Sequence, residues 1–148
     1  NDYLHLDKKK AMEEINEEEC VILKKLTNNY KTQIVVQEFL PDIYDGDVRV
    51  LIIHGKPYEK TLARIPQGGS FKGNLAAGGK GEVRDISDIQ MRIGSVVGEF
   101  LMEKDINFAG IDIIGQKLTE INITSPTCAR EIFEQSGMNP IEEYFKKL

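Results

Sequence analysis

The stretch GIDIIGQKLTEINITSPT, which runs from Gly110 to Thr127, decides the fold of this chain. Isoleucines alternate with polar residues in two runs, Phe108–Ile114 and Lys117–Ile123. Such alternation predicts two β-strands, because successive side chains of a strand point to opposite faces of its sheet. The two runs meet near Gly115-Gln116, so we expect them to form a hairpin.

The loop between these strands decides which polar side chains share a face. If the loop has an odd number of residues, such as 115–117, Asp112 and Glu120 share one face with Asn122 and the isoleucines occupy the other. A two-residue loop would place Glu120 beside the isoleucines instead. Burying an unpaired carboxylate costs several kcal/mol, so we expect the odd loop.

Two carboxylates and an amide oxygen on one face form a donor set that suits Mg²⁺. This ion is commonly held by one or two carboxylates, with water and phosphate oxygens in the remaining positions. Asp112, Glu120 and Asn122 are therefore candidate metal ligands. The alternative is a half-exposed hairpin whose polar side chains only face solvent.

Further strands are expected upstream of this hairpin. Gln33–Leu40 is β-branched and aromatic and is stopped by Pro41, and Asp47–Ile53 and Tyr58–Ile65 follow around a turn. These three runs predict three strands, mainly antiparallel.

Two arginines of these strands are candidate anion-binding residues. An even loop of two or four residues between their strands places Arg49 and Arg64 on one face, together with Asp47. Two arginines on one face repel each other, and they become useful where a polyphosphate bridges them through bidentate contacts. A solvated polar face is the alternative.

The segment Pro66–Glu82, PQGGSFKGNLAAGGKGE, carries six of the 13 glycines of the chain. It has neither the Walker nor the Rossmann glycine pattern, so it is no phosphate cradle of those types. Its composition predicts a mobile lid, in which Lys72 and Lys80 reach an anion and Asn74 hydrogen-bonds a substrate. A flexible connector is the alternative.

Helices are expected in the rest of the chain. Asp7 caps a first helix, Asp88–Lys104 forms a helix with a capping box at its start, Thr127 caps a short helix to about Gln135, and Asn139-Pro140 begins the last. Strands and helices alternate without a regular βαβ rhythm. We therefore expect an α+β fold, a mixed, mainly antiparallel sheet flanked by helices.

The corner Ser125-Pro126-Thr127-Cys128 follows the acidic strand directly. The hydroxyls and free N–H groups of such a helix start can bind a carboxylate, and ordinary capping is an equally good explanation. Cys128 has no base or cation beside it in the sequence, so we expect a buried structural thiol. His5 and His54 are interpreted as surface or turn residues.

The composition is that of one compact globular domain, with 148 residues of which 41% are hydrophobic and 29% charged. The net charge of −5 excludes an overall basic surface for nucleic acid or an anionic membrane. The sequence has neither a transmembrane run nor a signal-peptide core, and its two cysteines lack metal or disulfide spacing. We expect a soluble, cytoplasmic protein with reduced thiols and without nucleic-acid or membrane partners.

Two longer stretches, LARIPQGGSFKGNLAAGGKGE at Leu62–Glu82 and GIDIIGQKLTEINITSPTCARE at Gly110–Glu131, resemble the bacterial glutathione synthetases, which are ATP-grasp carboxylate–amine ligases. The resemblance covers roughly Gln33 to Glu131 and implies the C-terminal subdomain of an ATP-grasp domain. It divides the chain into a helical lead-in at 1–32, strands at 33–65, a Gly-rich mobile loop at 66–82 and a metal-binding hairpin with helices at 83–148. We expect a fragment that does not include the N-terminal substrate domain.

The resemblance implies ATP-dependent ligation of γ-glutamylcysteine and glycine to glutathione through an acyl phosphate, with Mg²⁺ or Mn²⁺, in a homo-oligomer. It assigns catalytic roles to Arg49, Arg64 and Lys72, and metal binding to Asp112, Glu120 and Asn122. It assigns nucleotide contacts to Gln37, Glu38, Phe39, Leu40, Asp47, Arg49, Asn74, Gly78, Gly79 and Lys80. It assigns substrate contacts to Arg64, Lys72, Ser125 and Thr127. Lys72 and Lys80 stand where the family has arginine, which keeps the charge but loses the bidentate fork.

Two other functions stay open. One is a different ATP-grasp ligase, which joins D-alanines or adds glutamate to a protein terminus. The other is a non-catalytic nucleotide-binding fragment, because nothing before Gln33 matches the motifs that supply an ATP-grasp site with its lysines and its small Gly-rich loop. We expect these 148 residues alone to bind nucleotide weakly and to be inactive or nearly so.

Overall fold

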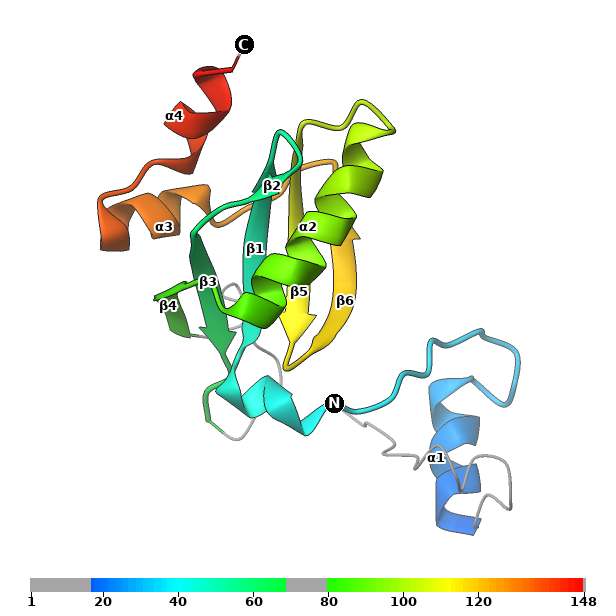
Figure 1. Cartoon of the computed structure of the whole chain (residues 1–148). Coiled ribbons are helices and arrows are strands. Elements are labelled where there is room, and N and C mark those ends of the chain that lie inside the picture. The colour runs from blue at the N-terminus through cyan, green and yellow to red at the C-terminus, as the bar shows by residue number, and fades with distance from the viewer. Residues whose placement is uncertain (1–16, 69–79, 148) are drawn as a thin grey trace. The chain divides into compact units, whose positions relative to one another are not determined.

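The computed structural model describes residues 17–68 and 80–147 of the chain. The chain divides into two compact units, residues 1–40 and 41–148. In the first, helix α1 spans Glu17–Leu26 and is followed by Asn28, Asn29 and Tyr30, all with positive φ (Figure 1). A run of left-handed residues cannot continue a helix, so the chain turns here. The expected cap Asp7 lies outside the described residues.

The expected strand over Gln33–Leu40 is absent from the structure, so this prediction was wrong. These residues have an extended, irregular backbone, and the side chain of Val35 is 85% exposed. Apolar β-branched residues favour a strand only where a neighbouring strand completes the hydrogen bonds and packing. Among the described residues no strand pairs with this segment.

The second unit is built on a six-stranded sheet with the order β4-β3-β1-β5-β6, in which β2 pairs with β1 and all pairs are antiparallel. A 3-10 helix, η2, at Pro41–Asp45 leads into it. The strands are β1 Asp47–Ile53, β2 Lys56–Pro57, β3 Lys60–Ile65, β4 Lys80–Asp85, β5 Phe108–Ile114 and β6 Lys117–Asn122. The expected α+β fold with a mainly antiparallel sheet is confirmed.

Strand β4 lies partly where only a Gly-rich loop was expected. The loop prediction over Pro66–Glu82 was wrong at its end, because Lys80–Glu82 belong to β4 and pair with β3. The sequence KGEVRD has one apolar residue, Val83, and therefore no alternation from which a strand could be predicted. Residues 69–79 lie outside the described residues.

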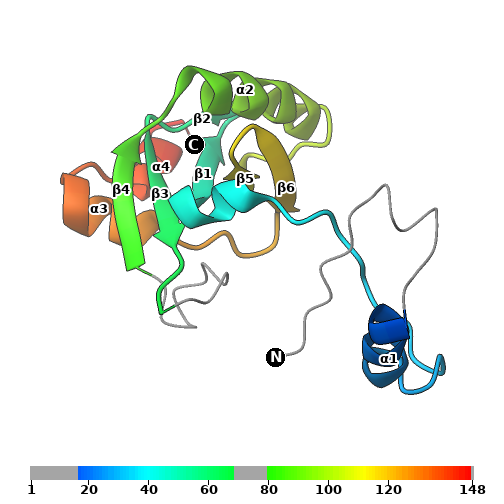
Figure 2. The ribbon, with the colours of Figure 1, turned by 90° about the horizontal axis from the view of Figure 1, so that it is seen from below.

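Helices cover both faces of the sheet. Helix α2, Asp88–Met102, lies across one face, where Val97 and Leu101 pack against Val50 and Ile111 (Figures 1 and 2). On the other face, α3 and α4 cover a second core around Leu51, Leu62 and Ile132. Helix α3 spans Ala129–Ser136 and α4 spans Pro140–Phe145. Two cores thus fix the sheet between its helices.

The expected helix starts were confirmed in two cases and wrong in the third. Ser87 and Gln90 form the capping box of α2, and the side chain of Asn139 caps α4. Thr127 does not cap α3. The residue at that position is Cys128, which has a left-handed backbone (φ 87°) and no side-chain cap bond. Its side chain packs into the second core, which holds it away from the helix N–H groups.

A close approach of α2 to the turn before β2 gives a stability prediction. A Cβ added at Gly98 would lie 2.0 Å from the backbone oxygen of Gly55. An alanine in an exposed helix position is favoured over glycine by about 1 kcal/mol, but here the helix would have to move away from the sheet. We expect Gly98→Ala to lower the free energy of unfolding by about 2–3 kcal/mol, measured by urea denaturation.

A matched variant on the same helix tests this explanation. A Cβ at Gly94 would meet ring carbons of Pro57 at 2.9 Å, which is less severe than a contact with fixed backbone. Gly94→Ala is therefore expected to cost less than Gly98→Ala. Equal stability of Gly98→Ala and the unaltered chain would show that α2 does not need this approach.

No helix in the described ranges 17–68 and 80–147 combines the length and the apolar character needed to cross a membrane.

Candidate functional site

One end of the sheet face that α3 partly covers carries four charged side chains. Asp47 is the β partner of Arg64, and Arg49 is the β partner of Asp112. Directly opposed residues of antiparallel strands place their side chains on the same face. Arg49 and Arg64 therefore share a face with Asp47, as expected, and the connection after β1 has the expected even loop, His54-Gly55.

These side chains form an ion-pair cluster, which we call the Arg–Asp cluster (Asp47, Arg49, Arg64 and Asp112), and in which Arg49 and Asp112 are buried and the other two are half-buried. The Nε and Nη2 atoms of Arg49 donate to the two carboxylate oxygens of Asp112, the Nη2 bond measuring 2.9 Å. The Nη2 of Arg64 lies 2.8 Å from Asp112 Oδ2 and 2.6 Å from Asp47 Oδ2. Two cations thus balance two anions, and Arg49 and Asp112 are each only 3% exposed.

The environment shifts the pKa values of the two carboxyl groups of the cluster in opposite directions. Burial alone would raise the pKa of Asp112, but the hydrogen bonds from Arg49 and the charge of Arg64 outweigh it and lower that pKa. For Asp47, burial is the larger effect and raises the pKa despite the charge of Arg64. Burial alone would lower the pKa of Arg64, but the charges of Asp47 and Asp112 outweigh it and raise that pKa. Asp112 is thus an anion held by two cations.

The cluster leaves one donor and one acceptor unsatisfied. Among the described residues, neither Nη1 of Arg49 nor Oδ1 of Asp47 has a hydrogen-bond partner, although both atoms are buried. A buried polar atom without a partner costs about 1–3 kcal/mol. An anionic oxygen placed at Arg49 would satisfy the free guanidinium N–H, so the cluster fits a ligand of the phosphate type.

The expected oxygen donors lie beside the cluster. Glu120 is the β partner of Asp112, and Asn122 is the partner of Gly110, so Asp112, Glu120 and Asn122 share the face as expected. The odd loop was wrong, because Ile114 pairs with Lys117 across a two-residue turn.

A β-bulge restores the register that the two-residue turn would otherwise lose. The pairing shifts between Asp112 and Ile113 and leaves Thr119 as an extra residue, whose hydroxyl donates to the Asp112 carbonyl at 3.1 Å. One inserted residue reverses the faces of everything that follows it. The argument from the cost of burying Glu120 therefore gave the correct face. The structure reaches this arrangement through a two-residue turn and a bulge instead of an odd loop.

The donor atoms fit a hard divalent cation. A carboxylate offers about four lone-pair sites, and the arginines use three of those on Asp112, which leaves one on Oδ1. Glu120 is exposed, and Asn122 Oδ1 accepts a hydrogen bond from Ser125 N–H at 3.2 Å. The described residues contain no group of three His, Cys, Asp or Glu side chains that could hold a metal. Ligand and water oxygens would have to complete the site, as Mg²⁺ prefers.

The segment after β6 passes over Arg49. A Cβ at Gly110 would lie 2.9 Å from Cδ and 3.0 Å from Nη1 of Arg49, and 3.0 Å from Cβ of Pro126. Gly110 thus leaves a slot that is bordered by the Arg49 side chain and by Pro126. A glycine inside a strand marks a close approach of this kind, which is the one signal in the sequence that could have identified it.

Filling this slot gives a second prediction. Gly110→Ala is expected to displace the Arg49 guanidinium and to weaken the binding of inorganic triphosphate by about tenfold, because the bidentate geometry with Asp112 is lost. Binding is measured by titration followed in NMR spectra of the folded chain. Gly137→Ala would be an unsuitable control because of its positive φ, so Ser95→Ala is used, on the helix α2 that covers the opposite face of the sheet. Unchanged triphosphate affinity in Gly110→Ala would contradict the slot.

The remaining predicted residues lie in different places. Ser125 and Thr127 are exposed in the segment between Asn122 and α3, beside the cluster. Lys80 is the β partner of Ile65, the residue after Arg64, so the structure places it on the opposite face and does not bring it to the cluster. Gln37, Glu38, Phe39 and Leu40 belong to the first unit. Lys72, Asn74, Gly78 and Gly79 lie outside the described residues.

The geometry supports no chemical role for Cys128. It is buried in the second core, and burial raises the pKa of its thiol despite the Thr127 hydroxyl. A raised pKa makes the thiolate scarce at neutral pH. The expectation that Cys128 is a buried thiol is confirmed.

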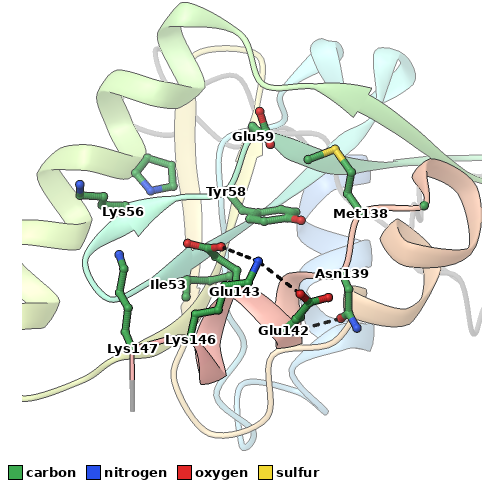
Figure 3. Close-up of a pocket in the computed structure, with 12 residues that line it drawn as sticks. Ile53, Lys56, Tyr58, Glu59, Met138, Asn139, Glu142, Glu143, Lys146 and Lys147 are labelled. Carbon is green, nitrogen blue, oxygen red and sulfur yellow. Dashed lines mark hydrogen bonds and ion pairs between the residues drawn. The ribbon is translucent and has the colours of Figure 1, made fainter.

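A separate hollow of about 540 Å³ lies at the other end of the sheet (Figure 3). Its lining includes Ile53, Tyr58, Glu59, Met138 and Lys146. Figure 3 shows Lys146 between Glu142 and Glu143, with which it forms ion pairs. Burial and the charges of the surrounding glutamates raise the pKa of Tyr58. None of the predicted site residues lines this hollow.

Comparison with known proteins places the chain in a family. Residues 10–137 match the model of the prokaryotic glutathione synthetase, ATP-grasp domain. The chain is 52% identical over 112 residues to the glutathione synthetase of Vibrio parahaemolyticus, which covers 76% of this chain and 35% of that protein. It is 51% identical over 119 residues to that of Pseudomonas syringae, covering 80% and 37%. The chain thus spans little more than a third of the length of these relatives.

A solved structure supports the fold. The ATP-grasp ligase PsnB, complexed with precursor peptide PsnA2 and AMPPNP, superposes with a TM-score of 0.53 at 16% identity, over 90% of this chain and 37% of that one. At this identity the likeness concerns the fold alone. The family match covers most of the sequence, and both comparisons agree on the fold, so this chain belongs to the prokaryotic glutathione synthetase ATP-grasp family.

Proposed function

We propose that this chain is the C-terminal part of an ATP-dependent ligase that joins γ-glutamylcysteine and glycine to form glutathione. The observation that carries the proposal is the Arg–Asp cluster, which has a free guanidinium N–H and lies beside Glu120 and Asn122. The names and the roughly half-identical sequences of the relatives support the substrate class.

In this proposal Arg49 and Arg64 hold the terminal phosphate oxygens of ATP. The carboxylate of γ-glutamylcysteine attacks the γ-phosphorus, ADP leaves, and the amine of glycine then displaces phosphate from the acyl phosphate. The two guanidinium groups are fixed by Asp112 and Asp47, so they need no reorganisation as charge develops on the transferring group. Asp47 serves the nucleotide indirectly, by fixing Arg64.

Asp112, Glu120 and Asn122 are the proposed ligands of Mg²⁺, or of Mn²⁺ in its place. When bound, such an ion supplies charge neutralisation at the phosphate oxygens. Ser125, tied to Asn122 by its N–H, and Thr127 are the proposed contacts of the peptide substrate. The roles of Lys72, Lys80, Asn74, Gly78, Gly79 and 37–40, the four-part division of the chain, the cytoplasmic location and the homo-oligomer stay predictions.

Titration of the chain with AMPPNP, with and without Mg²⁺, tests the proposal. We expect weak, saturable binding that needs Mg²⁺ and that shifts the NMR signals of Arg49 and Arg64. The chain spans about a third of the length of its relative, and little or no turnover is expected from these 148 residues alone. Absence of any shift at millimolar nucleotide would contradict a nucleotide site on this chain.

Phosphate release by the complete ligase separates the proposal from its rivals. It is expected with ATP, γ-glutamylcysteine and glycine together. Release that depends on D-alanine or on glutamate would identify a different ATP-grasp ligase, and nucleotide binding without release would identify a non-catalytic module.

A further inference from the structure

One side chain of α3, Gln135, is bonded to the backbone of the outer strand β4. Its Oε1 accepts the N–H of Val83 at 3.0 Å, and its Nε2 donates to the carbonyl of Gly81 at 3.3 Å. Strand β4 is an edge strand, with β3 as its neighbour in the sheet. Gln135 therefore supplies to β4 the hydrogen bonds that another strand would supply on that side.

The strand that Gln135 holds flanks the Arg–Asp cluster. Gly81 is the β partner of Arg64, so the two residues lie directly opposite each other in the sheet. Gly81 has no side chain, so no side chain of β4 stands directly opposite Arg64 on this face. The residues of β4 are only half-buried or exposed, and an edge strand with so little burial opens easily.

The other end of α3 reaches the second arginine. The helix begins after Cys128, and the segment before it carries Pro126, which borders the same slot as Arg49. A helix of eight residues thus joins the segment above Arg49 to the strand beside Arg64.

We propose that Gln135 is a positioning residue that holds β4 beside Arg64 through Gly81 and thereby sets how tightly Arg64 binds the terminal phosphates of a nucleotide. The inference rests on the proposed function, because it assumes that Arg49 and Arg64 hold phosphate oxygens. It adds a residue from α3 that has no contact with the nucleotide in that proposal. No pattern in the sequence marks Gln135, since it stands on an exposed helix position.

The test is a titration of the full chain with Mg·AMPPNP followed by NMR. Gln135→Met keeps the length of the side chain and removes both hydrogen bonds. Because both hydrogen bonds to β4 are lost, we expect the dissociation constant to rise about three- to tenfold. Gln135→Glu keeps the acceptor for Val83 and loses only the donor to Gly81, so it is expected to raise the dissociation constant less than Gln135→Met does. The neighbouring Glu134→Gln, which removes only an exposed contact with Arg130, is the control and should bind as the unaltered chain does.

A double-mutant cycle separates positioning from a general loss of stability. In an Arg64→Lys background, Gln135→Met is expected to change the dissociation constant less than twofold, because the group that it positions has gone. Melting temperatures are measured alongside, and additive stability losses of the two variants would leave this result unaffected. If the effects on affinity multiply in full, or if Gln135→Met binds as tightly as the unaltered chain, the inference is overturned and the proposed function stands. If the unaltered chain shows no binding, both are overturned.

Discussion

Replacing Arg49 by methionine is expected to lower the free energy of unfolding by about 3–5 kcal/mol, because it leaves a buried carboxylate with half of its compensation. Arg49 gives Asp112 two of its three charge-assisted hydrogen bonds, and both side chains are almost fully buried. Arg64 cannot replace these bonds, since its Nη2 already contacts Asp47. Urea denaturation at pH 7 measures the loss.

A double variant shows whether the loss comes from the uncompensated charge. Arg49→Met with Asp112→Leu removes both members of the pair, so that apolar side chains face each other between β1 and β5 and Arg64 keeps Asp47 as its partner. Stability is expected to recover most of the loss, because replacing both members of a buried ion pair is often close to neutral. Glu99→Gln, at an exposed position of α2, controls for the loss of a surface charge. A loss below about 1 kcal/mol in Arg49→Met would contradict the cluster as a stabilising unit.

Local patterns in the sequence predicted much of the fold. Strands β1 and β5 run over the expected residues because apolar alternation and flanking turns define them without reference to the rest of the chain. The sharing of one face by Arg49 and Arg64 followed from the parity of a short connection. Both results needed only neighbours in the sequence.

Long-range pairing could not be predicted in the same way. Arg49 meets Asp112 because β1 is the neighbour of β5, across 63 positions of the sequence, and no local pattern encodes that strand order. The expected strand at 33–40 failed for the converse reason, since its composition suits a strand but the described residues provide no partner strand. Strand β4 shows the reverse case, in which pairing with β3 creates a strand that its composition does not indicate.

The polar face that these side chains share was predicted from the sequence. The residues that support the two arginines were not predicted. Asp112, Glu120 and Asn122 share a face because a buried carboxylate is costly, and that argument holds whatever the loop geometry. Gly110 and Gln135 act on the arginines only through the packing of β5, β4 and α3. Their contacts come from the assembled sheet, so the sequence alone carries at most the hint of a glycine inside a strand.

Glu120→Gln is expected to lower the Mg²⁺-dependent turnover of the complete ligase by about a thousandfold and to leave the stability of the fold unchanged. A metal-bridging carboxylate stabilises the charge of the transition state by several kcal/mol, and a thousandfold corresponds to about 4 kcal/mol. Glu120 is exposed, and no salt bridge joins it to another residue in the part of the chain that the structure describes, so its amide analogue should cost less than about 0.5 kcal/mol of stability.

Comparison of Glu120→Gln with Arg49→Met separates the residues of the polar face that stabilise the fold from those that bind Mg²⁺. Arg49 and Asp112 are buried partners, so their loss is expected to appear in unfolding, whereas the loss of Glu120 is expected to appear only in the response to Mg²⁺. The measurement is phosphate release over a range of Mg²⁺ concentrations, with Glu99→Gln as the same substitution at an exposed site on α2. Turnover by Glu120→Gln equal to that of the control would remove Glu120 from the metal site. A loss of stability in Glu120→Gln comparable to that of Arg49→Met would assign Glu120 to the structural cluster instead.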